Sequence, residues 1–303
     1  MSAAPSVLYD APGPRGRTRN AIIGAIFIIV LLWIAYLVYS GFDEKGQWAG
    51  ALWEPFLRWS TWSEFVLPGL ANTLKAAALA IVIALPIGAL LGIGRLSEHA
   101  WIRVPAGVIV EFFRAIPVLL LMVFAAELYA GYTDIDATIR PLFAAVTGLV
   151  LYNGSVLAEV FRAGINALPR GQNEAAKALG MRKTQVMANV LLPQAVTLML
   201  PAIVSQLVVV LKDTALAGQL TVHYDELIRT SGGITGNFAN TIPTLIVTAT
   251  IYIVLNLLLS LLANKLEQRL SRRNRPAKGV KADKVQKVAV HIGTDADTGR
   301  ADA

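Results

Sequence analysis

Six long apolar stretches alternate with polar segments along this chain of 303 residues. The stretches are residues 20–42, 76–94, 104–130, 141–158, 184–211 and 230–264, and the last is most densely apolar over 243–263. A helix crosses a bilayer core with about 20 predominantly apolar residues. Over such a length only a helix satisfies its own backbone groups in lipid. The pattern predicts an all-α integral membrane protein with about six transmembrane helices.

The composition favours the same class. Hydrophobic residues make up 55% of the chain and charged residues only 16%, whereas soluble domains carry about 25% charged residues. The sequence has no cysteine, which excludes a disulfide-stapled secreted domain and thiolate metal sites. The three histidines, His99, His223 and His291, are far apart in the sequence, so we expect no metal centre.

Basic residues gather in alternate connections, which indicates the sidedness of the chain. One set comprises the segments before the first stretch, after the second, after the fourth and after the last: Arg15, Arg17, Arg19, Arg95, Arg103, Arg162, Arg170, Lys177, Arg182, Lys183, Lys265, Arg269, Arg272, Arg273 and Arg275. The other connections hold only Lys45, Arg58, Arg140, Lys212 and Arg229. With six crossings the basic set falls on one side, so we expect both termini in the cytoplasm. The net charge of +7 is then explained by basic residues beside the membrane, which are attracted to anionic lipid. We therefore expect no binding of nucleic acid.

The two ends of the chain are polar and lack apolar periodicity. Residues 1–20 are rich in proline and glycine, and we expect a flexible cytoplasmic N-terminus. The first apolar stretch suits an uncleaved transmembrane helix over 21–42 better than the shorter apolar region of a signal peptide. Residues 276–303 are expected to form a disordered cytoplasmic tail.

The connection over residues 163–192 is long enough to have structure of its own. Pro169 begins a turn, residues 172–179 have helix-forming composition, and Gly180 marks a helix end. A second short helix is expected from about residue 183 toward Pro193. Small alanines would let another protein approach this first helix closely, and Glu174 and Lys177 would lie at the rim. These residues alone leave open an ordinary surface helix or a docking site.

The spacing of particular residues in this connection resembles the EAA signature of ABC-importer permeases. The matching residues are Glu174, Ala175, Ala176, Gly180, Leu192 and Pro193, with Val190 where isoleucine is usual. The resemblance implies that the loop inserts into a cleft of a cytoplasmic ATPase and transmits its closure to the pore. The residues it assigns to ATPase coupling are Glu174, Ala175, Ala176, Lys177, Gly180, Leu192 and Pro193.

Further stretches resemble permeases for polar amino acids of the histidine, glutamine and glutamate type. They lie at 69–97, 110–121, 158–165, 171–180, 192–203 and 211–216, within a permease domain over 66–272. Ala215 replaces the usual serine of the last stretch. The extra N-terminal helix is similar to that of actinobacterial glutamate permeases. The resemblance implies the type I ABC-importer permease fold, in a bacterial cell membrane.

The same resemblance implies the partners of the chain. They are a cytoplasmic ABC ATPase dimer, a second permease subunit that is homologous or identical, and an extracytoplasmic substrate-binding protein. The sequence has no Walker A pattern, so we expect no enzyme activity and no cofactor in this chain, with ATP and Mg²⁺ bound by the ATPase. The expected solute is glutamate, and the alternatives are glutamine, aspartate or arginine.

An ion-coupled secondary transporter is an alternative from another class. It would be expected to contain inverted internal repeats, and no convincing repeat is found in the sequence. A membrane-bound enzyme is disfavoured because no pair of nucleophile and base is evident.

Ionisable residues within the apolar stretches need a partner or a function. Glu111 and Arg114 are three residues apart, as are Glu159 and Arg162, so each pair shares a helix face and can form an ion pair. Pro117 is expected to kink the third stretch. The predicted substrate-pathway residues are Glu111, Arg114, Lys212, Asp213 and Thr214.

Overall fold

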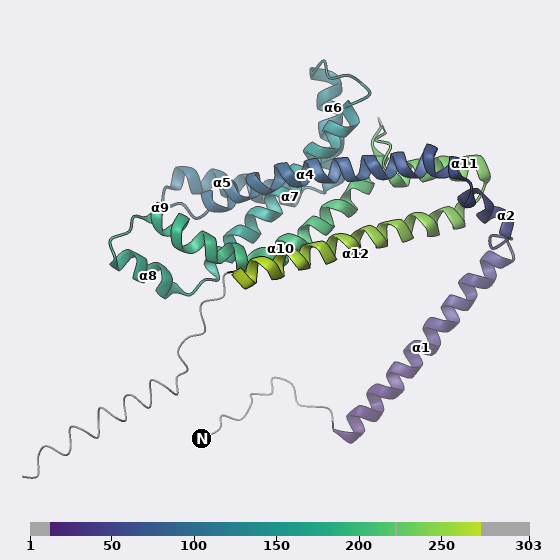
Figure 1. Ribbon diagram of the computed structural model, residues 1–303, viewed down its shortest axis with the longest axis horizontal. Helices are drawn as coiled ribbons and strands as arrows, with labels where there is room; N and C mark the ends of the chain where they lie inside the picture. Colours follow the sequence, from purple (N-terminus) through teal and green to yellow (C-terminus); the bar gives the residue numbers. More distant parts are fainter. Residues whose placement is uncertain (1–12, 222, 274–303) are drawn as a thin grey trace, which may run out of the picture.

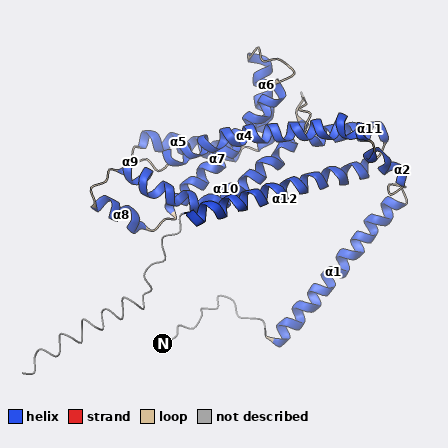
Figure 2. Ribbon diagram, viewed as in Figure 1, coloured by secondary structure: helices blue, strands red, loops and turns tan. Residues whose placement is uncertain are grey.

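The computed structural model describes residues 13–221 and 223–273, and every regular element in this part of the chain is helical (Figure 2). The long helices are α1 (Pro14–Asp43), α4 (Leu67–Gly94), α5 (Ala100–Ala115), α6 (Val118–Tyr132), α7 (Arg140–Asn166), α10 (Leu192–Asp213), α11 (Leu227–Phe238) and α12 (Thr241–Arg273). Between α1 and α4 lie α2 (Gly50–Trp53), η1 (Glu54–Leu57), α3 (Trp59–Thr61) and η2 (Trp62–Val66). The remaining short elements are α8 (Arg170–Ala178), α9 (Lys183–Val186), η3 (Met187–Leu191) and η4 (Thr214–Gln219).

Within the described residues, five helical segments are long and apolar enough to cross a membrane, and a sixth is counted when α5 and α6 together form one span. The prediction of about six helical spans is therefore confirmed. The predicted C-terminal tail over 276–303 lies outside the described residues.

Helix α1 begins at Pro14, inside the segment that was expected to lack structure. Proline suits the first turn of a helix because the missing N–H has no helical partner there. None of the side chains of α1 is buried, and Figure 1 shows the helix projecting away from the others. An apolar surface on all sides suits a helix surrounded by lipid.

The third apolar stretch is not one continuous helix, which corrects the expectation of a single kinked helix over 104–130. Helices α5 and α6 meet at an angle of 101°. Pro117 has no N–H to continue the helix and keeps the preceding residue out of the α region, and Ile116 accordingly has φ −93° and ψ 131°. The expected kink is a complete break.

The sixth apolar stretch is divided as well. Helix α11 ends at Phe238, Ala239 adopts a left-handed conformation with φ 51°, and α12 begins at Thr241. The dense apolar part at 243–263 lies within α12, as predicted.

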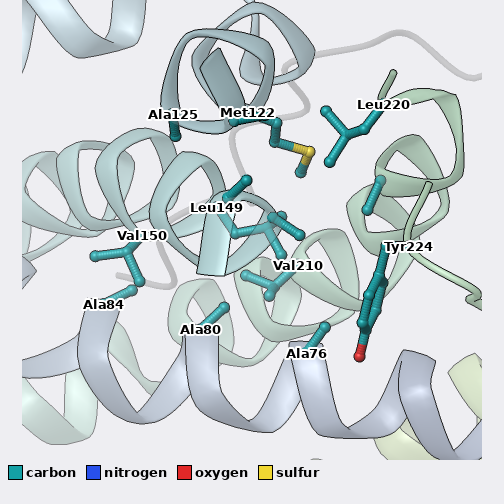
Figure 3. Close-up of a cluster of buried hydrophobic side chains, with 14 of the residues drawn as sticks. Ala76, Ala80, Ala84, Met122, Ala125, Leu149, Val150, Val210, Leu220 and Tyr224 are labelled. Atoms are coloured by element: carbon teal, nitrogen blue, oxygen red, sulfur yellow. The ribbon is translucent and has the colours of Figure 1, made fainter. Parts of the chain in front are cut away.

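The core lies where α4 packs against α7, with α6 and α10 beside them (Figure 3). Helix α4 presents small residues to this interface, including Ala76, Ala80 and Ala84, which are all fully buried. A Cβ placed on Gly92 would lie 2.6 Å from the backbone oxygen of Ala158. Small side chains let helix backbones approach closely. The resulting van der Waals contacts stabilise the association of helices in lipid.

Candidate functional site

The connection between α7 and α10 (residues 167–191, the α7–α10 connection) contains two short helices at one end of the bundle (Figure 1). Helix α8 starts after Pro169, whose backbone oxygen accepts a hydrogen bond from the Gln172 amide at 3.0 Å. Its span of Arg170–Ala178 agrees with the helix predicted from the sequence. The side chain of Gln194 in α10 donates to Gln172 Oε1 at 3.3 Å and so links the two helices.

Gly180 terminates α8 through a Schellman motif. The Gly180 amide donates to the backbone oxygen of Lys177 at 2.9 Å, and the Met181 amide donates to that of Ala176 at 3.3 Å. In this motif the residue that follows the C-cap adopts the left-handed conformation. Gly180 is that residue and has φ +77°. The corner that directs the chain from α8 to α9 therefore depends on glycine at this position.

The passage from α9 into α10 contains one wide turn. Residues Met187–Leu191 form the π-helical turn η3, which is followed directly by Leu192 and Pro193 at the start of α10. Because proline cannot donate to the preceding turn and its ring crowds the carbonyl four residues earlier, the wider turn accommodates it. Leu192 and Pro193 thus set the entry of the chain into α10.

The outer face of α8 is exposed and carries mixed chemistry. Ala176 is 5% exposed where α8 packs against α9 and η3, whereas Glu174, Ala175 and Lys177 are exposed. Leu179 follows the helix and is 83% exposed. The helix-forming composition of residues 172–179 does not single out Leu179, although an apolar residue beside the terminating glycine is a usable signal. One large apolar side chain is therefore exposed directly beside the end of α8.

A cleft of about 470 Å³ lies between the α7–α10 connection and the end of α7. Its lining includes Leu96, Ile165, Arg170, Asn173 and Lys183.

Ion pairs join three helices near this end of the bundle. The Arg95 guanidinium, at 15% exposure, lies 2.8 Å from Glu111 Oε1 of α5 and 2.9 Å from Glu159 Oε2 of α7. Arg162 also pairs with Glu159, as expected from their spacing. Arg114 lies farther from Glu111, at 3.8 Å. Arg95 is therefore the main partner of Glu111 and joins α5 to α7.

Sequence analysis missed this role of Arg95, which was counted only as a basic residue beside the membrane. The presence of two acids, Glu111 and Glu159, within apolar stretches was the signal that could have found it. The sequence predicts an ion pair only between each acid and a basic residue three positions away on the same helix. Contacts between different helices cannot be predicted from the spacing of residues along the chain.

The predicted substrate-pathway residues fall into two groups. Glu111 and Arg114 belong to the ion-pair cluster just described. Lys212, Asp213 and Thr214 lie where α10 gives way to η4, and the Thr214 hydroxyl donates to the backbone oxygen of Leu211 at 2.7 Å. Thr214 is buried, Asp213 is half-buried and Lys212 is exposed. The structure does not bring the two groups together.

A second polar cluster, which sequence analysis did not identify, closes the opposite end of the bundle. The carboxylate of Glu226 is fully buried and accepts hydrogen bonds at 2.7 Å from each of the Ile228 and Arg229 amides. Burial raises the pKa of Glu226, and these backbone bonds oppose the rise. Burial likewise raises the pKa of Tyr224 to about 12, and its hydroxyl donates to the backbone oxygen of Asn72 at 2.8 Å. These contacts fix the start of α11 against α4.

Comparison with known proteins identifies the protein family to which this chain belongs. Residues 84–272 match the family of binding-protein-dependent transport system inner membrane components. The chain belongs to this family. It is a multi-pass permease of the cell membrane, and the ABC-importer permease fold expected from the sequence is confirmed. The EAA residues lie within the matched range.

Relatives of this permease narrow the class of solute to amino acids. The glutamate transport system permease protein GluD of Corynebacterium glutamicum is 45% identical over 226 residues, which are 75% of this chain and 82% of that protein. The glutamate/glutamine/aspartate/asparagine transport system permease protein BztC of Rhodobacter capsulatus is 34% identical over 211 residues, which are 68% of this chain and 48% of that protein.

A solved structure supports the same class. The crystal structure of an amino acid ABC transporter with histidines aligns with a TM-score of 0.61 and 30% identity, covering 71% of this chain and 98% of that chain. The chain is an amino-acid permease of an ABC importer, and in its family ATP is hydrolysed by another subunit.

Proposed function

We propose that this permease imports glutamate and that the α7–α10 connection is its coupling segment, which docks on a cytoplasmic ATPase. The observation that carries the coupling role is the exposed face of α8, which presents Glu174 and Lys177 and is followed directly by Leu179, which is 83% exposed. The glutamate assignment is supported by the 45% identity to a glutamate permease.

The proposed importer contains a dimer of ATPases that bind ATP and Mg²⁺, a second permease subunit and an extracytoplasmic binding protein. Both termini and the basic-rich connections face the cytoplasm, where the ATPases are. Closure of the ATPases on ATP draws the coupling segments together and opens the path outward. The binding protein then delivers the solute, and hydrolysis restores the inward-facing state.

Leu179 provides a sharp test of docking. Burying a leucine side chain stabilises an interface by about 1.5–3 kcal/mol, so we expect Leu179→Ala to weaken binding of the ATPase by at least tenfold. Leu57 is a matched control because it is 86% exposed and lies in η1, outside the coupling segment. Affinity is measured on purified permease in detergent with its own ATPase. Equal weakening by Leu57→Ala, or none by Leu179→Ala, would contradict the coupling role.

The solute is tested with the whole importer in liposomes that contain ATP. Labelled glutamate should accumulate only with ATP and the binding protein, and unlabelled glutamate should compete better than glutamine, aspartate or arginine. Stronger competition by one of those three would transfer the assignment to that amino acid. Uptake that needs an ion gradient and continues without ATP would show a secondary transporter instead.

A further inference from the structure

The loop between α4 and α5 (residues 95–99, the 95–99 loop) makes polar contacts with one side chain of the α7–α10 connection, that of Lys183. Lys183, the first residue of α9, places Nζ 3.0 Å from Glu98 Oε1. The same ammonium donates to the backbone oxygen of Leu96 at 3.2 Å. Lys183 therefore holds a carboxylate and a main-chain oxygen of the same short loop.

The 95–99 loop is also fixed from the side of the membrane helices. Arg95 begins the loop and pairs with Glu111 and Glu159. Arg103 of α5 donates to the backbone oxygens of Ser97 at 3.0 Å and Glu98 at 3.2 Å. These contacts hold the start and the backbone of the loop, which joins α4 directly to α5.

Two cavities adjoin this contact. The cleft of about 470 Å³ and a second cavity of about 340 Å³ are both lined by Leu96, Glu98 and Lys183. The Lys183 contact therefore belongs to the lining that the two cavities share. Apolar packing of Met187 and Leu191 against the cluster around Phe161 joins the connection to α7 and α10, and Leu96 of the 95–99 loop packs against the same cluster.

We propose that Lys183 is a positioning residue that ties the coupling segment to the 95–99 loop. Movement of α8 driven by the ATPase then reaches α4 and α5 directly, in addition to α7 and α10. This inference rests on the proposed function, because it assigns a second mechanical path to the same coupling segment.

The test compares ATP hydrolysis with uptake in the whole importer in liposomes. Lys183→Ala should leave ATPase binding and stimulated ATP hydrolysis intact but reduce solute transported per ATP by two- to fivefold, since an exposed ion pair changes an equilibrium by up to about fivefold. The reversal Lys183→Glu with Glu98→Lys should recover part of the loss. Arg58→Ala is the control, because it removes an exposed pair at 2.7 Å within the segment between α1 and α4.

The absence of cysteine from the sequence permits a second measurement. Lys183→Cys with Glu98→Cys, bridged by a short thiol-specific cross-linker, should retain transport because the tie persists through the cycle. Loss of transport on cross-linking, an unchanged ratio in Lys183→Ala, or an equal fall in hydrolysis and uptake would overturn the proposal. Failure of the unmodified chain to bind any ATPase would instead refute the proposed function.

Discussion

Replacement of Gly180 tests whether the corner after α8 must be left-handed for coupling. At φ +77° an added Cβ would meet no atom within 4 Å, so the backbone conformation alone makes a substitution unfavourable. For an L-residue this amounts to about 1–2 kcal/mol, and asparagine tolerates the conformation better than alanine. A β-branched residue tolerates it least.

The expected order of ATPase affinity is therefore Gly180, then Gly180→Asn, Gly180→Ala and Gly180→Val. A cost of 1–2 kcal/mol corresponds to about 5- to 30-fold, which is the weakening expected for alanine if the free loop relaxes and the docked loop must be left-handed. Titration of the purified permease with its ATPase measures the affinity, and ATP-dependent uptake should fall in the same order. Four equal affinities, or asparagine weaker than alanine, would refute the reasoning.

Two other predictions concern the fold and its dependence on pH. Gly92→Val should lower the thermal midpoint of the purified permease by forcing α4 away from Ala158, at an overpacking cost of about 1–3 kcal/mol, whereas Gly107→Val, at a site with no neighbour within 4 Å, should change the midpoint little. A hydrogen bond from Lys183 lowers the pKa of the Glu98 carboxyl. The ion pair between Glu98 and Lys183 of α9 is therefore fully formed above the ordinary pKa of about 4.3. It is lost as the pH falls through the lowered pKa of Glu98. Spin labels at His99→Cys and Gln185→Cys should report separation of the two segments only in that acidic range, and separation near neutral pH would contradict the assignment.

The apolar pattern was sufficient to predict the spans, because lipid imposes the same length on every crossing helix. It could also locate the break at Pro117, since the missing N–H is a local property. The angle of 101° depends on how α6 packs against α7, where a Cβ on Gly148 would lie 2.5 Å from Met122. Such an approach between distant residues is not written in local spacing.

The candidate site divides in the same way. The helix over α8 and its end at Gly180 follow from composition and from the conformational freedom of glycine, and both were predicted. The link from Arg95 to Glu159 joins residues 64 positions apart, and that from Lys183 to Leu96 joins residues 87 apart. Only the folded chain decides which cation reaches which acid.

The isolation of α1 has a consequence for the topology of the permease. Since none of its side chains is buried, removing it would eliminate one membrane crossing without opening the core. An odd number of crossings places the two ends of a chain in different aqueous compartments. In a chain shortened to begin just before α2, a tag on the new amino terminus would therefore lie on the opposite side of the membrane from a tag on the full-length amino terminus. The remaining helices would keep their packing.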